Sequence, residues 1–202
     1  MIKKLYLGID PDLRLLNAAL IDQDKNAIAV FARKNKGLLG DSAVAAAVSH
    51  VKDLVNDIVL CVDMLNRRGV IDPVCTLVVV VESQSMTHAQ AMRKKGNNVN
   101  YQDILTTGQM AGIMMGAFSV LADKTVLVQP VTWKGTIPKP IAHKRYYSGL
   151  GLVPDPEKRV SCIYPDNKEE LCAHSGGKIN MGDFWDINDS LGLALYGAKK
   201  NL

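Results

Sequence analysis

Four acidic residues stand where they could do chemistry together. Asp10 and Glu82 each end an apolar run, "LYLGID" and "TLVVVVE", while Asp186 and Asp189 lie three residues apart near the C-terminus. Carboxylate oxygens are the ligands that Mg²⁺ and Mn²⁺ prefer, whereas zinc prefers His and Cys. Four bare acids would repel one another, so such a cluster is tolerated mainly when divalent cations neutralise it. Two ions about 4 Å apart can activate a water and stabilise the leaving oxygen in phosphodiester cleavage.

Taken singly, each acid also has an ordinary structural explanation. Asp10 before Pro11 fits a turn at the end of a strand, Glu82 fits a surface ion pair, and Asp186 fits a helix N-cap. The joint arrangement is what favours chemistry. Spacing alone does not exclude further acidic ligands, which are Asp12, Asp22, Asp24 and Asp183.

The elements that would position these acids follow from the apolar patterns. Alternation and turn residues predict three strands over 3–10, 17–22 and 27–34, joined as an antiparallel meander. Asp41 can cap a long helix that stops at Gly69. The β-branched run Thr76–Glu82 is typical of a central strand buried on both faces.

The second half continues with a helix from about 101 to 121 and a strand over 124–130. A loop rich in Pro, Gly and cations then leads into a short helix from about Ile141, and 153–183 is expected to be a surface insertion. In a last helix from about 186 to 199, an apolar stripe should leave both aspartates off it; the stripe comprises Ile187, Leu191, Ala194 and Ala198.

This order of elements predicts an α/β fold with a mixed five-stranded sheet, three antiparallel strands followed by parallel ones, and helices on both faces. In such sheets, ligands bind beyond the carboxyl ends of the strands, where Asp10 and Glu82 stand.

Length and composition indicate one folded domain spanning 1–202. The chain has 202 residues, of which 48% are apolar and 22% charged. We find no apolar run long enough for a membrane helix and no secretory signal pattern at the start, so we expect a cytoplasmic protein with no membrane partner.

Positive charge is concentrated in the middle of the chain. The net charge is +4, yet Met86–Val153 holds eight Lys or Arg against two Asp, a local +6. Such a focus favours a polyanionic partner, although a solvated basic face has the same composition. The segment "AMRKK", with Arg93, Lys94 and Lys95, would supply contacts to a nucleic-acid backbone that weaken steeply with salt.

The ordered acidic motifs resemble the RuvC family of Holliday-junction resolvases, which are RNase H-like nucleases. The resemblance rests on "LGIDP" at the first strand, "VVVE" at the strand after the long helix and "DINDSLGLALYG" near the C-terminus. Between them, "TTGQMAGIMMGA" is similar to the family's "LGQARG" helix. The resemblance runs in order over about 3–150 and 184–198.

The resemblance implies an RNase H-like nuclease with four metal-binding and catalytic acids, using Mg²⁺, with Mn²⁺ as a substitute, and two ions in each site. It also implies that Lys134 and Lys144 face phosphate; Arg145 lies beside Lys144 and is grouped with the DNA-binding residues. The small-residue helix from Tyr101 would be a homodimer interface, although its glycines and methionines could equally pack internally. The matched acids are Asp10, Glu82, Asp186 and Asp189.

The sequence departs from the family in two motifs. Asp12 stands where the family usually has Gly after "DP", which changes the turn or adds an acid to the metal site. The family often has an aromatic soon after the glutamate that helps to open the junction centre, and here Ser83, Gln84, Ser85 and Met86 contain none.

The resulting hypothesis is a Mg²⁺-dependent endonuclease that resolves four-way DNA junctions as a two-fold dimer, because two equivalent strands suit two copies of one site. Two alternatives remain open at this stage. One is an RNase H-like nuclease that cuts flaps, forks or RNA–DNA hybrids, and the other is a non-catalytic nucleic-acid-binding module. An actin-like ATPase is a distant third, because the chain is short for two lobes.

Overall fold

A six-stranded mixed sheet runs through the computed structural model, with the strand order β5-β4-β1-β2-β3-β8. The strands of this sheet are β1 (Ile2–Pro11), β2 (Leu15–Asp22), β3 (Ala27–Lys34), β4 (Ile71–Glu82), β5 (Lys124–Val128) and β8 (His174–Gly176). Strands β1, β2 and β3 pair antiparallel, whereas β4 joins β1, β5 joins β4 and β8 joins β3 in parallel. A separate two-stranded ribbon pairs β6 (Val153–Pro154) with β7 (Cys162–Ile163).

The structure describes residues 1–12, 15–34, 41–84, 101–150, 153–154, 162–163, 174–176 and 181–202. Its helices are α1 (Asp41–Arg67), α3 (Tyr101–Phe118), α4 (Pro130–Trp133), α5 (Lys139–Leu150) and α6 (Met181–Lys200). None of these described helices is long and apolar enough to cross a membrane.

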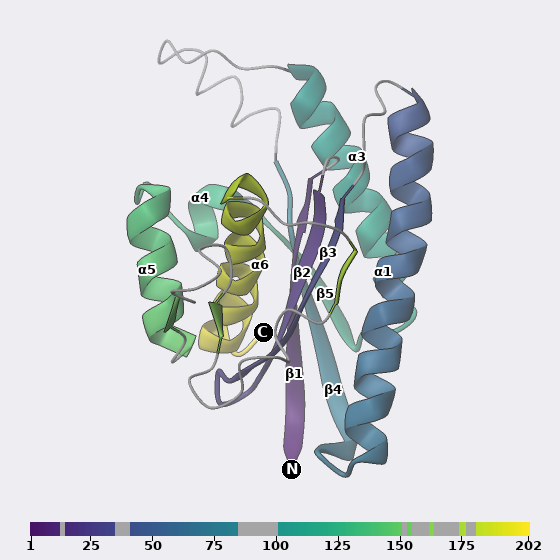
Figure 1. Ribbon diagram of the computed structural model, residues 1–202, viewed down its shortest axis with the longest axis vertical. Helices are drawn as coiled ribbons and strands as arrows, with labels where there is room; N and C mark the ends of the chain where they lie inside the picture. Colours follow the sequence, from purple (N-terminus) through teal and green to yellow (C-terminus); the bar gives the residue numbers. More distant parts are fainter. Residues whose placement is uncertain are drawn as a thin grey trace.

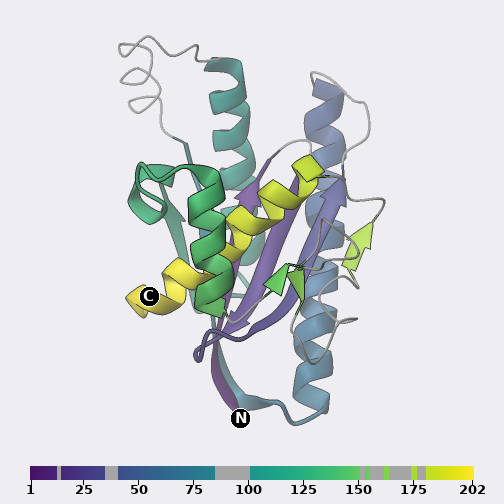
Figure 2. The ribbon, with the colours of Figure 1, turned by 60° about the vertical axis from the view of Figure 1, so that its left-hand side comes forward.

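The helices form one layer on each side of the sheet (Figure 1). Helices α1 and α3 cover one face, and α6, with α4 and α5 outside it, covers the other, an arrangement that the turned view also shows (Figure 2). Strand alternation divides the side chains between these layers. Leu5, Leu7 and Ile9 join the core beneath α1 and α3, while Tyr6 packs with α6.

Most of the predicted elements are confirmed. Helix α1 ends before Gly69, which adopts a φ of 66°, a left-handed conformation that glycine reaches without a steric penalty. The three-stranded meander and the parallel strands β4 and β5 are also present.

Several boundaries differ from the sequence prediction. Strand β4 begins at Ile71 instead of Thr76, because Ile71 pairs with Ile2 at the start of β1. Helix α6 begins at Met181, so Asp186 lies inside the helix and is not its N-cap. Within the expected insertion 153–183, β8 pairs with β3 and extends the five predicted strands by a sixth.

The predicted apolar stripe on α6 packs into the core, but burial also extends around the rest of the helix. Every residue from Ile187 to Leu195 is buried, and Asp189 is only 2% exposed. The physical reason is that α6 is enclosed, with the sheet on one side and α4 and α5 on the other.

Candidate active site

Asp10 and Glu82 come together because β1 and β4 are parallel neighbours. The register pairs Ile9 with Val81, so each acid is the next residue beyond that pair. Ile9 and Val81 face the α1 and α3 layer, and alternation therefore assigns both acids to the α6 face of the sheet. The parallel register therefore places the two predicted acids at neighbouring strand ends, and their role stays a prediction.

Asp189 reaches the same place from above the sheet, because α6 lies unusually close to β1. A Cβ at Gly8 would stand 2.1 Å from the Ser190 carbonyl oxygen and 2.4 Å from the Ala194 nitrogen. Both are main-chain atoms, so only glycine permits this approach. Asp10 follows Gly8 by two residues, and Asp189 directly precedes Ser190. The close approach of β1 and α6 at Gly8 therefore brings these two acids to the same end of the sheet.

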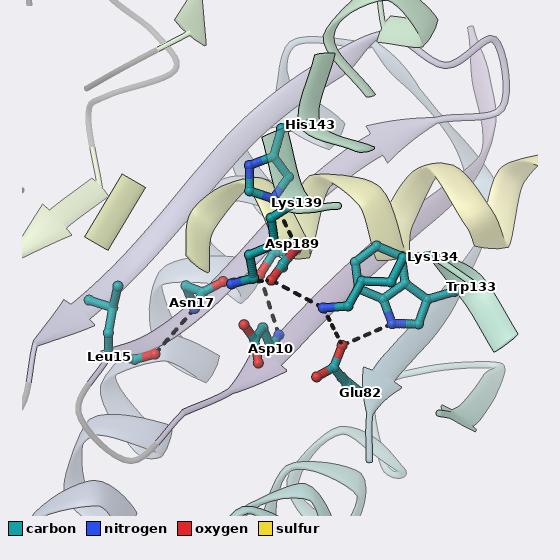
Figure 3. A network of polar contacts seen from close by, with 10 residues as sticks. Asp10, Leu15, Asn17, Glu82, Trp133, Lys134, Lys139, His143 and Asp189 are labelled. Carbon is teal, nitrogen blue, oxygen red and sulfur yellow. Dashed lines mark hydrogen bonds and ion pairs between the residues drawn. The ribbon is translucent and has the colours of Figure 1, made fainter. Parts of the chain in front are cut away.

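Three side chains, one from the loop after α4 and two from α5, surround the Asp189 carboxylate (Figure 3). Lys139 Nζ lies 2.8 Å and Lys134 Nζ 3.5 Å from Oδ2, while His143 Nε2 lies 3.0 Å from Oδ1. His143 is 1% exposed and Asp189 2% exposed. A charge removed from water in this way is tolerated only with such close partners.

Glu82 shares one of these partners and has another of its own. Lys134 Nζ stands 3.9 Å from Glu82 Oε2, and the Trp133 indole N–H donates to the same oxygen at 2.9 Å. The Lys134 ammonium therefore lies between Glu82 and Asp189, and it stands 5.0 Å from the centre of the Trp133 ring. A cation at this position is attracted both by the two carboxylates and by the indole face.

The two buried acids have opposite pKa shifts. Burial raises the pKa of Glu82 and Asp189 raises it further, against the lowering effects of Lys134 and the Trp133 hydrogen bond. Burial also tends to raise the pKa of Asp189, but the His143 hydrogen bond, Lys134 and Lys139 outweigh it and hold that pKa below its usual value.

An aromatic wall, formed by Trp133, His143 and Tyr146, closes the site on the α5 side. The centre of the Tyr146 ring lies 5.7 Å from that of Trp133 and 5.8 Å from that of His143. Burial and the charges of Asp189 and Glu82 raise the pKa of the Tyr146 hydroxyl, which stays neutral. Gly192 makes room for this wall, since a Cβ there would stand 2.5 Å from Trp133 and 2.6 Å from Tyr146.

The arrangement fits a hard divalent cation in its donor chemistry. Glu82 and Asp189 offer only carboxylate oxygens and already share one positive charge, the Lys134 ammonium. Asp10 stands at the adjacent strand end. Within the described side chains, however, no group of three or more His, Cys, Asp or Glu is placed to hold a metal ion. The side chain of Asp186, whose main chain lies in α6, is outside the described part of the structure.

The basic residues predicted to bind DNA fall into three groups. Lys134 lies within the acidic site, as above. Lys144 and Arg145 are exposed on α5. Arg93, Lys94 and Lys95 lie outside the described residues.

Sequence reasoning missed several residues of the site. The spacing of Lys139 and His143, four apart, was a usable signal, because residues so spaced share one helix face. Trp133 follows no periodic pattern, and only the path of α4 brings its indole to Glu82. Asn17 and Ser190, which hydrogen bond to each other at the end of β1, gave no signal either.

Antiparallel β1–β3, parallel β4 and β5, and helices on both faces define an RNase H-like fold, with acids at the shared end of the central strands. Among solved structures, that of T. thermophilus RuvC in complex with Holliday junction substrate is similar to this chain, with a TM-score of 0.54 and 14% sequence identity. The match covers 97% of this chain and 96% of that one. The fold is therefore RuvC-like, as predicted. No protein-family model matches the sequence, and no curated protein sequence is detectably similar to it.

Proposed function

We propose that this protein is a Mg²⁺-dependent endonuclease that cleaves branched DNA, with four-way junctions as the preferred substrate. The observation that carries the proposal is the Lys134 ammonium held between Glu82 and Asp189, beside Asp10, at one end of a RuvC-like sheet. Cleavage of a phosphodiester requires positive charge near the phosphate oxygens and a base that deprotonates the attacking water. Acids that bind cations, together with a lysine at the same point, can meet these requirements.

In this proposal Asp10, Glu82 and Asp189 hold divalent cations, and Asp186 completes the set from the preceding turn of α6. Bound Mg²⁺, or Mn²⁺ in its place, would lower the pKa of a water and stabilise the leaving oxygen, and two ions are proposed for each site. Trp133 fixes the orientation of the Glu82 carboxylate, and His143 fixes that of Asp189.

Among the described residues, Lys134 and Lys139 are the cations that contact the site acids, and we assign them to the phosphate being cleaved. Lys139 replaces Lys144 in this role, because Lys139 reaches Asp189 while Lys144 is exposed farther along α5. Lys144 and Arg145, with Arg93, Lys94 and Lys95, are proposed to contact the DNA backbone outside the site.

We propose a homodimer because a four-way junction presents two equivalent strands. Helix α3 supports this on one side: Gly108, Gly112 and Gly116 lie four residues apart, and apart from adjoining residues and the helix's own backbone, no atom in the described part of the chain comes within 4 Å of a Cβ built at any of them. Its other side packs inward through Met110, Met114 and neighbouring core residues. The internal packing weighed in the sequence analysis thus applies to the methionines, and the proposed interface applies to the glycines.

The test is cleavage of an end-labelled four-way junction in Mg²⁺, beside linear duplex, flap and RNA–DNA hybrid controls. Asp10→Asn should reduce cleavage by about a thousandfold, since loss of several kcal/mol of charge stabilisation corresponds to that factor at 1.36 kcal/mol per tenfold. Asp63→Asn, a matched change on the exposed surface of α1, should cleave like wild type.

The result decides between the classes of function. Paired nicks in the junction alone, lost in Asp10→Asn while binding persists, support a resolvase. Preferential cutting of flaps or hybrids would retain the nuclease and overturn the junction specificity. Binding without cutting in either Mg²⁺ or Mn²⁺ would overturn the nuclease in favour of a binding module.

A further inference from the structure

A chain of hydrogen bonds ties the main chain at Asp10 to α6 and to β2. The Asp10 amide N–H donates to Ser190 Oγ at 3.3 Å, and the Ser190 hydroxyl donates to Asn17 Oδ1. Asn17 Nδ2 in turn donates to the Leu15 carbonyl oxygen at 3.2 Å (Figure 3). Ser190 and Asn17 are both completely buried.

We propose that Ser190 and Asn17 are positioning residues for Asp10, holding its main chain so that its carboxylate stands at a fixed place relative to Asp189. The inference rests on the proposed function of these acids as cation ligands. It concerns two residues that touch neither the cation nor the substrate in that proposal.

The hydrogen bond from the Asp10 amide to Ser190 connects two acids of the site, because Ser190 is the neighbour of Asp189 in the chain. Ser190 directly follows Asp189, so the hydroxyl that accepts from Asp10 belongs to the same turn of α6 that presents Asp189. The spacing of the two acids is thus set by one short connection. A site that binds cations through several carboxylates needs such fixed spacing, and loss of outer supporting contacts commonly costs 10- to 100-fold in affinity.

Asn17 determines which way the Ser190 hydroxyl group donates its hydrogen bond. Asn17 is the register partner of Asp10 across the β1–β2 pair, so it lies beside the residue that it helps to hold. A mid-helix serine otherwise tends to bond to the carbonyl four residues back in its own helix. Here the Ser190 hydroxyl donates its hydrogen bond to Asn17 Oδ1 instead. The lone pairs of Ser190 Oγ are therefore available to accept from the Asp10 amide N–H.

The first test follows the Asp10 amide by hydrogen exchange, measured by NMR on the full chain. Ser190→Ala should increase exchange at Asp10 by about tenfold, an energy of 1.36 kcal/mol, whereas Leu7 in the same strand should be unchanged. Ser190→Thr, which keeps the hydroxyl, should restore protection. Ser119→Ala removes a serine–carbonyl bond at the far end of α3 and serves as the matched control.

The second test measures Mn²⁺ affinity by titration calorimetry, without DNA. Ser190→Ala should bind at least about tenfold more weakly than wild type, Asn17→Ala should show a smaller loss, and Ser190→Thr and Ser119→Ala should bind like wild type. Thermal unfolding of each variant identifies any that do not fold. If Ser190→Ala does not fold, the Mn²⁺ affinity of Asn17→Ala is compared with that of wild type instead.

The outcomes separate this inference from the proposed function. If wild type binds Mn²⁺ and folded Ser190→Ala binds equally well, the positioning role is overturned while the nuclease proposal stands. If wild type binds no divalent cation, the proposed function fails, and unchanged exchange at Asp10 in Ser190→Ala would overturn the hydrogen-bonded connection as well. Faster exchange at Asp10 together with weaker Mn²⁺ binding, both reversed in Ser190→Thr, supports the inference.

Discussion

The two faces of the sheet carry very different interiors. The face beneath α1 and α3 is an apolar core of aliphatic residues with Phe31 and Phe118. On the face beneath α6, apolar residues are interleaved with buried polar side chains. Six of the seven buried polar residues among those described lie on or against α6, the exception being Asp22 at the end of β2; the six are Asn17, Glu82, His143, Asn188, Asp189 and Ser190.

This contrast separates the source of stability from the source of chemistry. Apolar burial on the α1 and α3 side contributes roughly 25 cal/mol per Å² and needs no directional partners. On the α6 side, each buried polar group costs free energy unless a partner with good geometry compensates it, and a low-dielectric surrounding strengthens the pairs that do form. The same surrounding would make charged groups effective on a phosphodiester.

The largest effect on stability is expected on the apolar side. Phe118→Ala removes a completely buried ring and should reduce the free energy of unfolding by about 3–5 kcal/mol, measured by denaturant titration. Mn²⁺ affinity of the folded variant should be unchanged. A tenfold loss of that affinity would show that the two faces are not independent.

A smaller effect on stability, joined to an effect on the site, is expected for Trp133→Phe. The change removes the indole N–H that donates to Glu82, at a cost of about 2 kcal/mol for a hydrogen bond to a charged group. Because that bond lowers the Glu82 pKa, its loss should raise the pKa further and weaken Mn²⁺ binding at neutral pH. In a Glu82→Gln background the same substitution should have little effect on Mn²⁺ binding, and an undiminished effect would assign the loss to packing.

The smallest effects concern pH, where Glu82 and Asp189 should act in opposite directions. The folded pKa of Asp189 is depressed, so its contribution to stability is present above the unfolded value of about 3.9 and is lost as pH falls through the folded pKa. The folded pKa of Glu82 is raised, so its contribution is present below about 4.3 and is lost as pH rises through the folded pKa.

Unfolding of Asp189→Asn and Glu82→Gln, compared with wild type between pH 3 and 8, checks these signs. Relative to wild type, Asp189→Asn should become less stable as pH rises from 3, and Glu82→Gln should become more stable. Parallel curves for the two variants would contradict the opposite shifts.

The sequence predicted the sheet and two of the acids because both depend on local patterns. Alternation assigns Ile9 and Val81 to one face and therefore Asp10 and Glu82 to the other, and the parallel pairing of β1 with β4 follows from the long helix between them. Asp189 was also expected near these strands, where α6 places it, and the roles of all four acids stay predictions.

The rest of the site depends on packing that no period in the sequence encodes. Helix α6 is covered on two sides, so its apolar residues do not form the single stripe that a surface helix shows. Trp133, Lys139 and His143 reach the acids only because α4 and α5 fold back over α6. Local pattern reasoning cannot supply a contact that depends on where a third layer docks.

Gly8 affects the site because it has no side chain, which allows α6 to lie close to β1. Any larger residue there would push α6 away from β1 through main-chain atoms, and Ser190 and Asp189 would move with the helix, out of reach of Asp10 and Glu82. A substitution at Gly8 would then be recorded as a loss of the proposed nuclease activity, although residue 8 has no functional group. In a map of mutational tolerance, this glycine would belong with the acids.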